Sequence, residues 1–88
     1  MGPGLGEQTR AALTNLEACL EAAGAALTDV VRWSVLVVSG SDVREGLAAF
    51  GEVWPEGTPP PAITVAFVAG LAVPGALVEI EALAAVMP

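Results

Sequence analysis

The chain has 88 residues, of which 55% are hydrophobic and only 15% are charged. Ten acidic residues stand against three arginines, with no lysine or histidine, so the net charge is −7. This charge opposes binding to nucleic-acid phosphates and to anionic membrane surfaces, and we expect neither partner. The absence of histidine excludes histidine-dependent ribonuclease chemistry and a histidine-ligated metal site.

The length supports a single domain over residues 1–88, with a flexible start at 1–5. So short a chain cannot easily bury this much apolar material, and we expect a homo-oligomer whose subunit contacts cover the excess. The start lacks the basic and apolar runs of a signal peptide. The uncharged stretch 57–78 contains four prolines, which a membrane-spanning helix could not accommodate. We expect a soluble, cytoplasmic protein.

Two helices are predicted. In the stretch 5–23 polar residues recur at steps of three and four opposite an apolar face, which indicates an amphipathic helix that Gly24 ends. A second helix follows the loop 39–42, where Asp42 and Glu45 fit a capping box. Pro55 ends this helix, and its apolar stripe consists of Val43, Leu47, Phe50 and Trp54.

Three strands are predicted, at 30–38, 62–69 and 76–86. Five valines in the first indicate a strand covered on most of both faces, and so not an edge, with Val31 and Trp33 on the same face. In the third strand Glu79 and Glu81 share a face, because side chains alternate along a strand. The order helix–strand–helix–strand–strand predicts an α+β domain.

Several segments, in this order, resemble one protein family. The first-helix pattern is carried by 8–16 and 20–24, the start of the middle strand by 28–31, and the end of the second helix with its loop by 50–60. The most specific segment is 77–82, with the sequence LVEIEA. The chain resembles the Rid family, the reactive intermediate deaminases, also called YjgF or endoribonuclease L-PSP proteins.

The resemblance implies a chorismate-mutase-like α+β fold with two helices on one face of the sheet, assembled as a trimer with ligand clefts between subunits. It also implies hydrolysis of enamines and imines without a metal or cofactor. In active members an arginine on the penultimate strand holds the substrate carboxylate, and a glutamate on the last strand positions the water or proton. Glu79 matches that glutamate and is the candidate catalytic residue.

The chain departs from the family at the other site positions. Ile63 stands where the family has the arginine, Val65 where cysteine or threonine is common, and Gly51 where an asparagine is found. These three are the expected ligand-cleft positions, substituted in this chain. The strand pair that precedes the first helix in the family is missing as well, so we expect an uncovered sheet edge, which favours pairing with another chain.

Other residues have two interpretations. Glu79 and Glu81 belong either to a cleft or to a polar face that keeps the strand soluble. Arg32 could replace the lost arginine if its face met the cleft, although a surface role is favoured. Cys19 lies on the apolar side of the first helix, so we expect a buried thiol, and the two tryptophans are expected in the core or an interface.

These departures favour a degenerate Rid-type protein that lacks imine deaminase activity and acts as a small-molecule-binding or assembly module. The alternative is a working enamine or imine hydrolase that uses Glu79 with a substrate anchor other than arginine. Ribonuclease activity, which the family name suggests, is disfavoured because the chain is strongly acidic and has neither histidine nor lysine.

Overall fold

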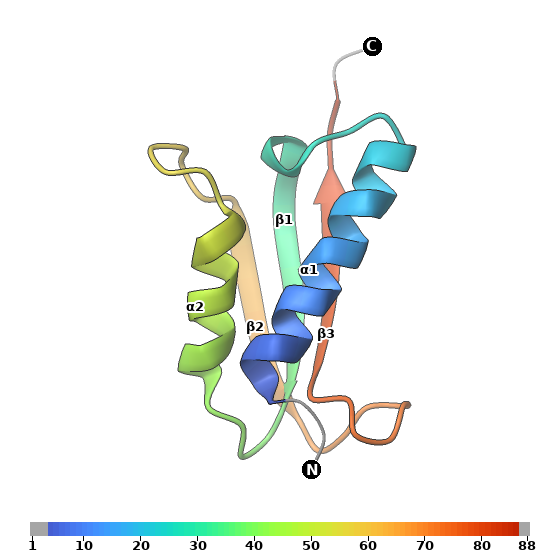
Figure 1. Ribbon diagram of the computed structural model, residues 1–88, viewed down its shortest axis with the longest axis vertical. Helices are drawn as coiled ribbons and strands as arrows, with labels where there is room; N and C mark the ends of the chain where they lie inside the picture. Colours follow the sequence, from blue (N-terminus) through green and yellow to red (C-terminus); the bar gives the residue numbers. More distant parts are fainter. Residues whose placement is uncertain (1–3, 87–88) are drawn as a thin grey trace.

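The computed structural model describes residues 4–86. The chain forms α1 (Leu5–Ala22), a short 3-10 turn (Leu27–Asp29), β1 (Val30–Val38), α2 (Val43–Val53), β2 (Ala62–Val68) and β3 (Val78–Ala84). Both helices lie on the same face of a three-stranded sheet (Figure 1). The α+β class is thereby confirmed. Of the expected flexible start, residues 1–3 lie outside the described part, whereas Leu5 opens α1 and is buried.

The sheet has the order β2-β1-β3, with β1 parallel to β2 and antiparallel to β3. The central place of β1 confirms that this valine-rich strand is not an edge. Only one of its faces is covered by described helices, whereas coverage of both was expected (Figure 1). The face that carries Trp33 packs under the helices, and the face that carries Ser34 remains open within one chain.

An irregularity at the start of β1 changes which side chain enters the core. The register against β3 shifts between Val30 and Arg32, so strict alternation fails at this point. Val30 is 4% exposed and packs with Trp33, whereas Val31 is 48% exposed. The expectation that Val31 would share the buried face of Trp33 is therefore wrong.

The core lies between α1 and the middle of the sheet. Its centre is formed by Leu13, Leu20, Val30 and Trp33. The indole of Trp33 is fully buried and meets the ring of Phe50 edge to face, with centroids 5.1 Å apart. Cys19 lies on the exposed flank of α1, where it borders a groove beside β3, so the expected buried thiol is wrong.

Polar contacts cap α2 and join it to α1. Asp42 caps α2 by accepting from the backbone N–H of Arg44 at 3.1 Å. The predicted reciprocal capping box is not formed, because the Glu45 carboxylate instead accepts from the N–H of Gly6 on α1 at 3.4 Å. Farther along, Arg10 of α1 donates to both carboxylate oxygens of Glu52 on α2, at 2.8 and 3.0 Å.

The side chain of Gln8 ties the turn before β3 to α1. Its amide nitrogen donates to the carbonyl of Gly75 at 2.9 Å, and its amide oxygen accepts from the N–H of Leu77 at 2.7 Å. Both bonds join residues that are far apart in the sequence, so Gln8 fixes where β3 begins against β1.

Candidate functional site

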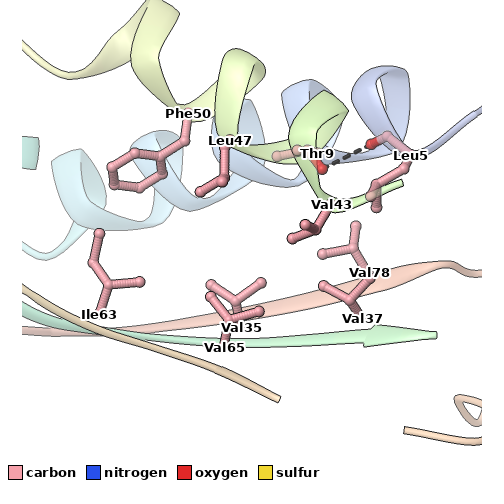
Figure 2. Close-up of a pocket in the computed structure, with 11 residues that line it drawn as sticks. Leu5, Thr9, Val35, Val37, Val43, Leu47, Phe50, Ile63, Val65 and Val78 are labelled. Atoms are coloured by element: carbon pink, nitrogen blue, oxygen red, sulfur yellow. Dashed lines mark hydrogen bonds between the residues drawn. The ribbon is translucent and has the colours of Figure 1, made fainter. Parts of the chain in front are cut away.

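An apolar hollow lies between α2 and the sheet, close to the first turns of α1 (Figure 2). Side chains of the two helices form its roof and those of the three strands form its floor. The lining consists of Leu5, Thr9, Val35, Val37, Val43, Gly46, Leu47, Phe50, Ile63, Val65 and Val78. The hollow therefore combines the apolar stripe of α2 with the buried face of β1.

The lining carries no charged side chain. Its one polar side chain is that of Thr9, which is 4% exposed and whose hydroxyl donates to the carbonyl of Leu5 at 2.7 Å. That donor is thus already used inside α1. The hollow can offer a ligand dispersion and hydrophobic contact, but no ion pair from its own side chains.

Two of the three expected cleft positions meet in this hollow. Ile63 and Val65 point from β2 toward α2, and with Leu47 they stay partly exposed, at 41%, 38% and 55% respectively (Figure 2). These three side chains border the opening toward solvent. Gly51 does not belong to the lining, and a Cβ atom at this position would meet no other atom within 4 Å.

Glu79 and Glu81 lie on the other face of the sheet. Glu79 stands opposite Leu36 and Glu81 opposite Ser34, whereas Ile63 stands beside Trp33 on the helix-covered side. Both glutamates are exposed. Within one chain the structure therefore does not bring Glu79 together with the expected cleft positions.

Arg32 is the cation nearest to the two glutamates along the ladder. It stands opposite Leu83 on the open face and borders a shallow hollow with Ser34 and Glu81. The other two arginines are engaged in ion pairs, Arg10 with Glu52 and Arg44 with Asp42. Arg32 thus shares a face with Glu79 and not with Ile63.

Both ion pairs shift the pKa values of their carboxyl groups, and both lie outside the apolar hollow. Hydrogen bonding to the Arg10 guanidinium lowers the pKa of the Glu52 carboxyl, and the Arg44 side chain lowers that of Asp42. Among residues 4–86, no group of three or more histidine, cysteine or carboxylate side chains could hold a metal ion. In the same part of the chain, neither helix is long and apolar enough to cross a membrane.

Sequence reasoning missed the part of the hollow that α1 supplies. The pattern of α2 indicated an apolar stripe with Leu47 and Phe50, but nothing in it located Leu5 and Thr9 across from that stripe. Gly46 faces both side chains, since a Cβ atom there would be in ordinary van der Waals contact with the Thr9 hydroxyl oxygen, at 3.4 Å, and with Leu5, at 3.6 Å. A glycine in mid-helix was the available signal.

The chain was compared with known proteins. The family model described as Endoribonuclease L-PSP matches residues 2–86. A structure from Mycobacterium tuberculosis, described as a member of the highly conserved YjgF/YER057c/UK114 family, is 38% identical with a TM-score of 0.83, and the match covers 98% of this chain and 71% of that one.

Two further structures are similar. A Yersinia pestis protein of unknown function from the conserved Rid family is 37% identical (TM-score 0.82; 98% of this chain, 65% of that one). RidA from an Antarctic Psychrobacter is 34% identical (TM-score 0.82; 93% and 64%). None of the curated proteins matches the chain significantly. The family match and these similarities show that the chain belongs to the Rid family, also named YjgF or Endoribonuclease L-PSP.

Proposed function

We propose that this chain is a degenerate Rid-family protein that lacks imine deaminase activity and acts as an oligomeric small-molecule-binding or assembly module. One observation carries the proposal. Position 63, which the family resemblance assigns to the substrate-binding arginine, holds an isoleucine in a hollow without any charged side chain. An anionic substrate would lose its hydration there without gaining an ion pair.

The oligomer, most simply the trimer of the family resemblance, is supported by the apolar surface of the single chain. Large hydrophobic side chains are exposed on both faces of the sheet, among them Phe67 at 55% and Leu83 at 56%. Surface of this kind on a small domain favours burial against another subunit. The separation of Ile63 from Glu79 also favours clefts built from two subunits.

A release assay with 2-aminoacrylate tests the loss of deaminase activity. We expect ammonia release at the rate of buffer alone. Turnover clearly above buffer that disappears in Glu79→Gln would overturn the proposal, because it would show that this carboxylate still works. Glu81→Gln is the matched control, since it removes another exposed carboxylate from the same face.

The second candidate is a hydrolase that uses Glu79 with a different substrate anchor. The observation that favours it is the place of Arg32, which lies on the face of Glu79 and forms no ion pair among the described residues. In this case the turnover would disappear in Arg32→Ala as well as in Glu79→Gln. RNA cleavage is not proposed, because a net charge of −7 opposes phosphate binding.

A further inference from the structure

We propose that the hollow between α2 and the sheet binds a small, uncharged, apolar molecule of about the size of a single ring. The inference names a ligand class for the small-molecule-binding role and rests on that proposed function. It differs from the carboxylate ligand that the family resemblance implies, and it follows from two properties of the hollow, its lining and its enclosure.

The lining selects against charge. Its one polar side chain, Thr9, already donates its hydroxyl hydrogen inside α1, so an ionised ligand would find no side-chain donor or counter-ion. Burying an ionised carboxylate without such partners is strongly unfavourable. The net charge of −7 adds long-range repulsion of anions. A neutral ligand meets neither penalty and gains contact with Phe50 and the valines of the floor.

The enclosure favours a small molecule over a protein segment. Both helices and all three strands contribute to the walls, and Leu5 and Val37 in the depth of the hollow are 3% and 2% exposed. Leu47, Ile63 and Val65 are the exposed side chains of the lining, so they mark its side toward solvent. Because the helices cover the hollow on one side and the sheet covers it on the other, a helix or strand of another protein could not enter it.

The size limits the ligand further. The space not filled by atoms is about 440 Å³ when the open mouth is counted, and the cavity itself is about 40 Å³. The second figure corresponds to room for roughly three water molecules. A single ring needs more room than this, since the apolar cavity known to hold benzene measures about 150 Å³. We therefore expect the Leu47 side chain, which is 55% exposed, to turn outward when a ring binds.

Phenol and benzoate are suitable probes because both carry one ring, and at pH 7 the first is neutral and the second is an anion. Each is titrated into the full chain, and the methyl resonances of Ile63, Val65 and Leu47 are followed by NMR. We expect phenol to shift these signals saturably and benzoate to bind at least about tenfold more weakly. Methyls of the open face, such as those of Leu36 and Leu83, should not move.

Ile63→Arg reverses the preference by placing a guanidinium at the mouth, so benzoate should bind more tightly than phenol. Val73→Arg is the matched control, because it adds the same charge at a side chain that is 67% exposed in a loop. Val73→Arg should bind phenol and benzoate as the unchanged chain does. If Ile63→Arg fails to fold, the comparison of the two probes on the unchanged chain still tests the ligand class.

Equal or tighter binding of benzoate to the unchanged chain would overturn the ligand class, as would phenol shifts spread evenly over both faces of the sheet. Absence of saturable phenol binding would overturn the site itself. None of these results depends on imine turnover, so failure of this inference is distinguishable from failure of the proposed loss of deaminase activity.

Discussion

Ile63 and Glu79 lie on opposite faces of one three-stranded sheet. Ile63 stands beside Trp33 and points toward the helices, whereas Glu79 stands opposite Leu36 and points away from them. Because the sheet itself separates the two side chains, no change of rotamer can bring them together within one chain. A site that combines an anchor at position 63 with this carboxylate requires two copies of the chain.

This geometry makes a prediction for restored activity. If Ile63→Arg creates imine hydrolysis in an inert parent, the double variant Ile63→Arg/Glu79→Gln should be inactive by itself. Mixed with the unchanged chain under conditions that exchange subunits, it should regain activity, because one copy supplies the arginine and another supplies Glu79. Ammonia release from 2-aminoacrylate measures the effect.

The mixture needs its own control. Replacing the unchanged chain by Glu79→Gln should leave the mixture inactive, since no carboxylate then remains at this position in any copy. Activity of the double variant alone would show that Glu79 is dispensable. If Ile63→Arg is active but the exchanged mixture stays inactive, both groups must come from one chain, against their placement on opposite faces of the sheet.

The open face of the sheet gives a prediction for assembly. Leu83 is 56% exposed there, and Leu83→Asp would bring an uncompensated carboxylate into any interface on this face, which already carries Glu79 and Glu81. We expect the mass from light scattering to fall from that of an oligomer to that of a monomer. Val73→Asp, in a loop and 67% exposed, should not change the mass.

Two outcomes would contradict this account of assembly. A monomeric unchanged chain would remove the oligomer altogether. An unchanged mass for Leu83→Asp would place the subunit contacts away from the open face. Circular dichroism of both variants separates a change of assembly from loss of the fold.

Much of the fold could be predicted from the sequence because its signals are local. The run of valines located β1 to the residue, and Gly24 and Pro55 marked the regions where the helices end. The alternation of side chains along β3 also placed Glu79 and Ile80 on opposite faces of the sheet, as the structure has them. The bulge near Val31 could not be predicted, because it depends on how β1 pairs with β3, which no local pattern reports.

The candidate site was less accessible from sequence. The resemblance singled out Ile63, Val65 and Glu79, but which faces they share depends on which strands pair and in what register. The helix pattern put Cys19 on the apolar side of α1, but its thiol is exposed beside a groove that Ile80 and Ala82 of β3 also line. Glu45 was expected to form a capping box with Asp42, but its carboxylate accepts from the N–H of Gly6 on α1 instead.

Gln8 provides a prediction about the order of the turn before β3. Gln8→Leu removes the side-chain hydrogen bonds to Gly75 and from Leu77, and should lower the free energy of unfolding by about 1–3 kcal/mol. The amide of Leu77 should exchange with solvent faster as well. Gln8→Glu keeps the acceptor for Leu77 and should protect this amide better than Gln8→Leu does. Equal protection of Leu77 in all three chains would contradict the role of Gln8.

The ion pair between Arg10 and Glu52 predicts a pH dependence of stability. The guanidinium holds the pKa of the Glu52 carboxyl below its ordinary value of 4.5 in the folded state. A lowered pKa stabilises the fold above the unfolded-state value, and the contribution is lost as pH falls through the folded-state pKa. The same ion pair raises the pKa of Arg10, and this contribution is lost only at strongly alkaline pH, outside the range of the experiment.

Thermal unfolding of Glu52→Gln against the unchanged chain measures this contribution. Both partners are about half exposed, so we expect a Tm difference of no more than about 4 °C between pH 6 and 8. The difference should shrink toward zero well below pH 4.5 and also in 1 M salt, which screens exposed charges. Glu56→Gln, which removes a loop carboxylate without an ion pair among the described residues, should show no such pH-dependent difference. A Tm difference for Glu52→Gln that persists at low pH would mean that the side chain acts by packing between α1 and α2 rather than by its charge.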